Sequence, residues 1–260
     1  MPTIPDKHAI DALGRELQQA PIVRSIEGQR TYLELMEFAG RELQQIEAQI
    51  AATVESSAEV VARVKSIETI HDKLVRLPSL KLSQMDDLIG VRVVQDLSLS
   101  EQTELCRRLQ ELFPNSLIKD RRVAPKSGYR AAHVIVRSEP LHAEIQVRTS
   151  LQASWADVYE GIADKWGRGI RYDEPVTGSN PAQIEARQGV ISLMQDLSLR
   201  LLVDIEELRD ALDHMALPLE IDFKRRHVMT RAGARRRVAK QQLKVRELMD
   251  RVATMAGEIK

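Results

Sequence analysis

Short apolar segments rich in β-branched residues fill residues 88–148, and helical patterns lie on both sides of them. Four segments have the length of strands, and the last two also alternate: DLIGVRVVQD, SLIKDRRV, AAHVIVR and HAEIQVRT. A stretch with helical spacing, SLSEQTELCRRLQELFPN, lies between the first two. The order strand, helix, strand, strand, strand predicts an α/β (α+β) fold with a mixed β-sheet. SEPL, between the last two strands, is typical of a hairpin turn.

Long helices are expected on both flanks of this core. Between residues 6 and 76 apolar residues step by three and four, and we expect one helix to begin near Ser56 or Ser57 and to continue toward Pro78. Helices resume at Ser150, and the last should begin at about His227. The chain is therefore divided into an N-terminal helical region (1–56), a central catalytic domain (57–166), a loop (167–180) and a C-terminal helical region (181–260). The coiled-coil-like ends favour packing within the chain, and a homo-oligomer is an alternative use of them.

The formal net charge is zero, with 38 Lys and Arg against 38 Asp and Glu, but the charges are unevenly spread. Residues 204–222 hold seven acids and one Arg, whereas residues 223–246 hold ten Lys or Arg and no acid. The interpretation that we favour is that these stretches pair with each other or form solvated faces. The alternative is that the basic helix 224–246 binds RNA or a protein partner.

A single cysteine, Cys106, excludes an internal disulfide and a four-cysteine zinc site. No apolar run approaches the roughly 20 residues that span a bilayer. The N-terminus lacks a basic segment followed by an apolar one, which a secretory signal requires. We therefore expect a cytoplasmic protein with no membrane partner.

Two carboxylates are candidates for a magnesium site. Asp87 directly precedes the first strand, and Glu144 lies in the last strand, where it shares one face with Gln146 and Arg148. Mg²⁺ prefers one or two carboxylates together with phosphate oxygens and water. An open-faced antiparallel sheet would account for the same polar face without a ligand.

Basic residues suited to phosphate occur nearby in the sequence. Lys65, Thr69 and Lys73 share a face of the expected helix, and Arg63 converges on them if it lies at the helix entry. A solvated helix face is the ordinary alternative. Tyr129 follows a glycine at a turn, where its ring can stack on a base or cap the core. Neither a P-loop nor a G-x-G-x-x-G motif is present in the sequence.

Four motifs follow one another in a specific order: RVKSIETIHDK (63–73), DLIGVR (87–92), PKSGYRAAH (125–133) and EIQVRT (144–149). This order resembles the synthetase domain of RelA/SpoT-type alarmone synthetases, over about residues 60–165. No hydrolase domain and no long regulatory region accompany the motifs in this sequence, so the chain resembles a small, synthetase-only member.

The resemblance implies a fold similar to the polymerase-β-like nucleotidyltransferases. It also implies a reaction in which the β,γ-pyrophosphate of ATP moves to the ribose 3′-hydroxyl of GDP or GTP with Mg²⁺ as cofactor. The implied roles are Asp87 and Glu144 for metal binding and catalysis; Arg63, Lys65, Thr69, Lys73 and Arg92 for ATP; and Lys126, Tyr129, His133, Gln146 and Arg148 for the acceptor nucleotide.

The sequence departs from the family pattern at a few positions. Thr69 replaces the usual serine, the loop from Lys126 to Tyr129 is one residue shorter, and no Glu-His pair follows Ala156. The change at Thr69 keeps the hydroxyl, and because the other two departures touch the acceptor side, three interpretations stay open. The first is an alarmone synthetase acting on GDP, GTP or an adenosine nucleotide. The second is a toxin-type relative that pyrophosphorylates the tRNA 3′ end and has an antitoxin partner. The third is a non-catalytic nucleotide-binding regulator.

Overall fold

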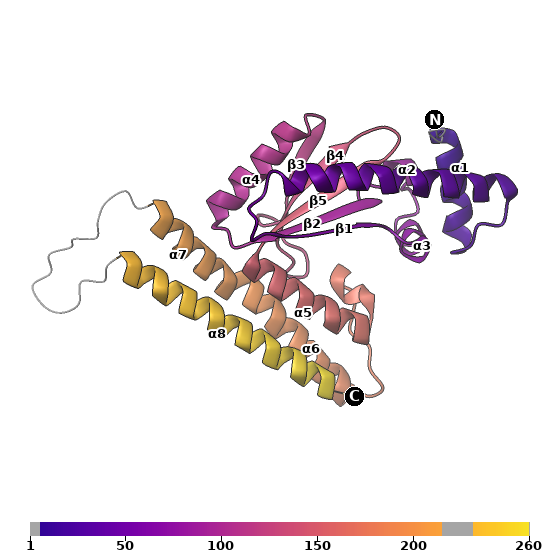
Figure 1. Cartoon of the computed structure of the whole chain (residues 1–260). Coiled ribbons are helices and arrows are strands. Elements are labelled where there is room, and N and C mark those ends of the chain that lie inside the picture. The colour runs from indigo at the N-terminus through magenta and orange to yellow at the C-terminus, as the bar shows by residue number, and fades with distance from the viewer. Residues whose placement is uncertain (1–5, 215–230, 260) are drawn as a thin grey trace, which may run out of the picture. The chain divides into compact units, whose positions relative to one another are not determined.

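The computed structural model of the chain describes residues 6–214 and 231–259 (Figure 1). The described residues form two compact units. Unit 1 holds those within 1–95, 104–119 and 132–147, and unit 2 holds those within 96–103, 120–131 and 148–260. Each unit is described by itself below.

A five-stranded sheet is the centre of unit 1, with the strand order β1-β2-β5-β4-β3. The strands are β1 (Glu59–Val64), β2 (Ile89–Gln95), β3 (Ser116–Asp120), β4 (Ala132–Arg137) and β5 (His142–Thr149). β1 pairs with β2 and β4 with β5, both antiparallel, so SEPL is indeed the turn of a hairpin. The predicted α+β class with a mixed sheet is confirmed.

Helix α2 (Ile26–Ala51) packs on the sheet of unit 1, and α1 (Lys7–Gln19) packs on α2 and on α3 (Ile67–Arg76). A 3₁₀ turn, η1 (Leu82–Gln84), precedes β2, and α4 (Leu99–Leu112), whose first residues belong to unit 2, follows it. Figure 1 shows α2 lying across the strands, and α2 contacts both β1 and β2. Leu35, Ala39 and Ile50 of α2 are fully buried, because the three-and-four spacing of its apolar residues gives it one apolar face.

The helix expected over residues 56–78 is wrong in its first half. Strand β1 occupies Glu59–Val64, and α3 begins only at Ile67. The segment EVVARV is rich in β-branched valine and alternates in exposure, and β2 pairs with it along its whole length. Strand pairing therefore replaces the helical continuation, and Ser66 caps the shorter helix.

Unit 2 is built mainly from helices: α5 (Ser150–Trp166), α6 (Pro181–Asp196), α7 (Val203–His214) and α8 (Arg231–Glu258). The expected loop 167–180 contains a 3₁₀ helix, η2 (Arg168–Tyr172), and a π-helical segment, η3 (Leu197–Leu202), joins α6 to α7 without a break. Trp155 stacks on Tyr159 with a centroid separation of 4.6 Å, and both rings lie in the core of these helices. The residues expected to start the basic helix, 224–230, lie outside the described residues, and the rest of it belongs to α8.

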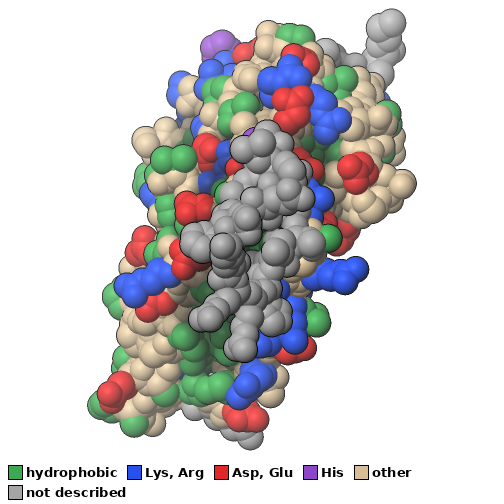
Figure 2. Space-filling model, turned by 90° about the vertical axis from the view of Figure 1, so that its left-hand side faces the viewer, with side chains coloured by type: hydrophobic (Ala, Val, Ile, Leu, Met, Phe, Trp, Pro, Cys, Tyr) green, Lys and Arg blue, Asp and Glu red, His purple; other side chains and the backbone are tan. Residues whose placement is uncertain are grey.

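In the part of the chain that the structure describes, none of the helices is both long and apolar enough to cross a bilayer. Figure 2 shows Lys and Arg side chains lying next to Asp and Glu side chains over much of one face.

Candidate functional site

Strand register in unit 1 brings many of the predicted residues to the less buried face of the sheet. On this face Arg63 of β1 lies opposite Gly90, next to Arg92 of β2. On the other hairpin His133 of β4 lies directly opposite Gln146 of β5. Glu144 alternates with buried residues of β5, as the sequence pattern predicted. The sheet therefore presents carboxylate, imidazole, amide and guanidinium groups on one side.

Asp87 is held by two lysines. Its carboxylate lies 3.1 Å from Nζ of Lys65 and 2.5 Å from Nζ of Lys73. Lys65 lies between β1 and α3, where its backbone N–H donates to the carbonyl of Leu88, and Lys73 lies on α3. Burial alone would raise the pKa of Asp87, but the two ammonium charges outweigh burial and hold that pKa below its ordinary value. Asp87 is therefore ionised at neutral pH.

Thr69 lies in the first turn of α3, close to the lysines in sequence but with different partners. Its hydroxyl donates to the carbonyl of Ser66 at 2.9 Å, and its backbone N–H faces the capping side chain of Ser66. The N-terminus of α3 carries a positive partial charge, which favours an anion there, and the carboxylate of Glu68 already accepts hydrogen bonds from its own backbone N–H and from Ser66. The hydroxyl of Thr69 is likewise engaged by the backbone of this turn.

Glu144 accepts two hydrogen bonds within unit 1. Nδ1 of His133 lies 2.9 Å from one carboxylate oxygen, and Nε2 of Gln146 donates to the other at 2.8 Å. Burial raises the pKa of Glu144, whereas His133 and then Gln146 lower it, and the result lies below the ordinary value. The negative charge of Asp87 raises that pKa as well, so the two carboxylates lie close enough to interact.

The donor set of this cluster suits a hard divalent cation that arrives with other ligands. Among the described residues, no group of three or more His, Cys, Asp or Glu side chains is arranged to hold a metal by itself. Asp87 and Glu144 supply two carboxylates, and magnesium sites often complete such a pair with substrate phosphates and water. The lysines beside Asp87 would then lie next to the phosphates.

A neighbouring acidic residue, Asp86, has separate partners that the sequence did not suggest. Its two oxygens lie 3.0 Å from Nδ1 of His142 and 2.6 Å from Nζ of Lys119. Asp86 and Asp87 are adjacent in the turn before β2, and each contacts different basic side chains. This pair fixes the start of β2 to β5 and β3 and leaves Asp87 to the lysines.

The remaining predicted residues, Lys126, Tyr129 and Arg148, belong to unit 2. The guanidinium of Arg148 lies 5.1 Å from the ring centroid of Tyr129 and donates to its hydroxyl at 3.2 Å. Glu160 lies 3.6 Å from the same guanidinium. Lys126 is exposed at the turn, and its carbonyl accepts from the N–H of Tyr129 at 2.8 Å.

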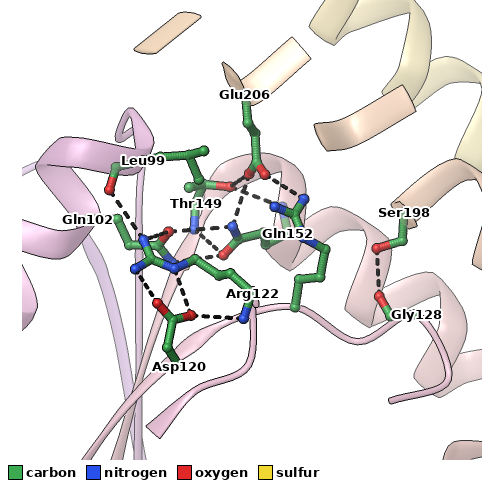
Figure 3. A network of polar contacts seen from close by, with 10 residues as sticks. Leu99, Gln102, Asp120, Arg122, Gly128, Thr149, Gln152, Ser198 and Glu206 are labelled. Atoms are coloured by element: carbon green, nitrogen blue, oxygen red, sulfur yellow. Dashed lines mark hydrogen bonds and ion pairs between the residues drawn. The ribbon is translucent and has the colours of Figure 1, made fainter. Parts of the chain in front are cut away.

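Sequence reasoning missed the residues that hold this turn. Ser127 donates to Asp173, and Arg130 pairs with the buried Glu206. The carbonyl of Gly128 accepts from Ser198 (Figure 3). The sequence carried no clear signal for the buried acid, because Glu206 is one of several acids in residues 204–213. The partner itself, 76 residues away, leaves no periodic pattern.

Comparison with known proteins gives three findings. Residues 62–171 match the model of a region found in RelA/SpoT proteins. Uncharacterized proteins of Mycobacterium tuberculosis and Mycobacterium bovis are each 45% identical over 145 residues, which is 54% of this chain and 52% of theirs. The chain thus spans about half the length of the curated relatives it matches.

The third finding concerns the fold. The structure is similar to small alarmone synthetase 1 from Bacillus subtilis, with a TM-score of 0.51 and 18% identity over 70% of this chain and 97% of that one. For the same synthetase bound to its product pppGpp, the TM-score is 0.50 at 17% identity, over 71% and 99% of the two chains. At sequence identities this low, the similarity to these structures shows a shared fold and nothing more.

Proposed function

We propose that the chain is an ATP-dependent nucleotide 3′-pyrophosphokinase, because residues 62–171 match the model of a region found in RelA/SpoT proteins and the fold is similar to that of a small alarmone synthetase. In the proposed reaction the ribose 3′-oxygen of GDP or GTP forms a bond to the β-phosphorus of ATP. The bond from that phosphorus to the α-phosphate oxygen breaks, AMP leaves, and the hydroxyl proton is released. The products are (p)ppGpp and AMP. The observation that carries the proposal is the Lys65–Asp87–Lys73 cluster beside Glu144.

The basic residues of unit 1 supply the charge that a triphosphate needs. Lys65 and Lys73 are anchored on Asp87, and we assign them, with Arg63, Arg92 and the α3 N-terminus around Thr69, to the phosphates of ATP. Phosphoryl-type transfer depends on positioning and on neutralisation of charge rather than on a covalent intermediate. The lysines can serve both purposes because Asp87 already limits their rotamers.

The carboxylates would hold Mg²⁺. When bound, the cation would neutralise charge on the phosphate oxygens and hold them in line for attack. Glu144 has two roles open to it, completion of the metal site or acceptance of the 3′-hydroxyl proton. Both require the ionised form, and His133 and Gln146 favour that form by hydrogen bonding and hold the carboxylate in one orientation.

We assign the acceptor nucleotide to the residues around Tyr129. Its ring can stack on a purine base, and Arg148 behind it stabilises the ring position by stacking and by a hydrogen bond. Lys126, exposed at the same turn, suits an acceptor phosphate, and we assign Gln146 and His133 to the acceptor side as well. Guanine recognition itself is a proposal that rests on the family.

A second candidate function is transfer to the 3′ end of tRNA, as in toxin-type relatives with an antitoxin partner. The observation that favours it is the basic surface of α8, where Arg236, Arg237, Lys240 and Lys244 are exposed. A third candidate, a nucleotide-binding regulator without catalysis, has less support, because both carboxylates and both lysines are retained in contact geometry.

The test is an assay of purified protein with Mg²⁺ and ATP labelled in the β- or γ-phosphate, offered GDP, GTP, ADP or bulk tRNA. We expect label in the guanosine nucleotide and one AMP per transfer, and none with the Asp87→Asn variant. Label only in tRNA contradicts the alarmone proposal and supports the second candidate. Nucleotide binding without any transfer supports the regulator.

A further inference from the structure

The turn that carries Tyr129 has an unusual backbone. Ser127 and Gly128 follow each other with positive φ values of 48° and 82°. The left-handed region is unfavourable for a serine, so such a turn persists only where its surroundings hold it. Lys126 and Tyr129 close the turn as an isolated bridge. The placement of Tyr129 therefore depends on what fixes residues 127–130.

Three side chains of unit 2 fix those residues one by one. Asp173 accepts from the hydroxyl of Ser127 at 2.6 Å, and the hydroxyl of Ser198 donates to the carbonyl of Gly128 at 2.5 Å. The guanidinium of Arg130 donates to Glu206 at 2.6 Å. Each residue on either side of Tyr129 is thus held from outside the turn.

Packing at Gly128 adds to these bonds. A Cβ atom built there would lie 2.8 Å from the ring of Trp155 and 3.2 Å from the backbone of Gln195. A side chain at position 128 would clash at these distances, and the positive φ of Gly128 also favours glycine. The turn is therefore pressed against α5 and the end of α6.

Glu206 is a buried hydrogen-bond acceptor that is surrounded by donors. Its side chain is 4% exposed, and Arg130 is 5% exposed. Its other oxygen accepts from Thr149 at 2.7 Å and from Gln152 at 3.0 Å (Figure 3). A buried carboxylate is costly unless it is saturated by donors, and these three saturate it.

The same network extends to the start of the segment that carries the turn. Gln152 donates to Gln102 at 3.4 Å, and Arg122 donates to Gln102 at 3.0 Å and to Asp120 at 2.6 Å (Figure 3). Residues 120–130 are thus tied at both ends to groups of unit 2. The network holds the residues on either side of Tyr129, and the ring itself packs against the core of the same helices.

Ser198 and Glu206 both lie beyond residue 171, where the RelA/SpoT region ends. Ser198 lies in the π-helical segment η3, and Glu206 in α7 directly after it. Wide π-type turns inside helices often occur at functional sites. We infer that Ser198 and Glu206 are positioning residues for Tyr129, so that the C-terminal helices set the binding of the acceptor nucleotide. The inference rests on the proposed function in one respect, the assignment of Tyr129 to the acceptor.

The kinetic test compares Ser198→Ala and Glu206→Gln with two matched controls, Ser192→Ala and Glu207→Gln. The side chain of Ser192 is exposed on α6, which leads into η3, and that of Glu207 is exposed on α7. Initial rates are measured with GDP varied at saturating ATP and Mg²⁺, and then with ATP varied at saturating GDP. We expect the KM for GDP to rise about tenfold or more in both test variants. The KM for ATP should stay within about twofold, and both controls should match the wild type. Equal changes in both KM values, or none, overturn the inference.

A second measurement does not depend on activity. Hydrogen exchange of a peptide covering residues 121–131 should become about tenfold faster in Ser198→Ala and Glu206→Gln, but not in the controls. Thermal unfolding identifies any variant that has lost its fold, and Ser198→Ala, which removes one hydroxyl, keeps the test available if Glu206→Gln unfolds. Unchanged exchange in folded variants overturns the inference.

The two proposals can fail separately. If the wild type transfers nothing to GDP, the proposed function fails with that acceptor. Faster exchange in the variants would then still support the C-terminal helices as the anchor of the turn. If the wild type is active on GDP and the variants bind it normally, the anchor fails and the proposed function stands.

Discussion

The carboxylate of Asp87 in unit 1 has two ammonium groups within 3.1 Å, those of Lys65 and Lys73. Replacing it by asparagine keeps the shape of the side chain and removes the charge. We expect Asp87→Asn to lose transfer activity by about a hundredfold or more, because both the proposed Mg²⁺ and the lysines would lose their partner. Product formation from labelled ATP measures the loss, and circular dichroism checks the fold.

Asp86→Asn is the matched control for this variant. Asp86 is adjacent in sequence, but its carboxylate binds Lys119 and His142 instead. We expect it to keep most of the activity. Equal loss in both variants would show that a general effect on the start of β2, and not the charge of Asp87, is responsible.

The depressed pKa of Asp87 also predicts how stability depends on pH. A carboxyl whose pKa is lower in the folded than in the unfolded state adds stability above its unfolded pKa of about 3.9. That contribution is lost as pH falls through the folded value. We therefore expect the difference in unfolding free energy between wild type and Asp87→Asn to shrink below about pH 4. Urea unfolding at several pH values measures it, and a difference that grows toward low pH contradicts the assignment.

Tyr129 offers a test of stacking at a single ring. Stacking of a base on an aromatic side chain contributes about 1–3 kcal/mol. We expect Tyr129→Ala to raise the KM for the acceptor about tenfold to a hundredfold and that for ATP much less. Tyr129→Phe keeps the ring and loses only the hydroxyl that accepts from Arg148, so it should lie close to the wild type. Equal effects of Tyr129→Ala on both substrates would remove its stacking role.

At the scale of elements, the start of α5 has two functions in one residue. Thr149 forms a capping box with Gln152, and its hydroxyl also donates to the buried Glu206. We expect Thr149→Ala to lower the unfolding free energy by about 1–3 kcal/mol, because the helix loses its cap and the carboxylate loses a donor. Thr149→Ser keeps the hydroxyl and should lose much less. Denaturant unfolding with an unchanged m value measures both, and equal losses contradict the assignment.

Element by element, the sequence predicted the parts whose signal is local. The hairpin of β4 and β5, the alternation of Glu144 with buried residues and the extent of α5 all follow from periodicity and turn residues. Strand β1 was mistaken for helix, because a six-residue valine-rich segment between two helical stretches has too little pattern to reveal its pairing with β2.

For the candidate site, too, part of the arrangement could be predicted from the sequence and part could not. The motif order placed Asp87 near Lys65 and Lys73, and the structure brings those three together. The bond between Thr69 and Ser66 and the pairing of Arg130 with Glu206 depend on geometry that only folding creates. Long-range partners of this kind leave no spacing in the sequence.

For the whole molecule, the zero net charge bears on the choice of acceptor. A protein that binds tRNA through phosphates loses affinity steeply with salt, whereas a small nucleotide held in a site is far less sensitive. Arg236 and Lys240 are exposed on α8. We expect the rate of pyrophosphate transfer to GDP in the double variant Arg236→Glu/Lys240→Glu to lie within about twofold of the wild-type rate. We also expect the rates of both proteins to change little between about 50 and 200 mM salt.

The same assay with tRNA as acceptor gives the contrast. If tRNA is the substrate, the double variant should lose transfer and the salt dependence should be steep. A large loss of transfer to GDP in the double variant would contradict this expectation, because it would show that the basic surface of α8 contributes to nucleotide transfer.

The π-helical segment between α6 and α7 has a consequence for comparing relatives. A π-turn holds about one residue more than an α-turn, so everything after η3 is rotated relative to an uninterrupted α-helix. In a homologue without the extra residue, the helix position that faces the turn would be one residue away from the position that aligns with Glu206. An alignment that matches letters alone would then report the acid as lost when it has only moved by one position. A search for this acid should therefore allow a single-residue gap within residues 197–202.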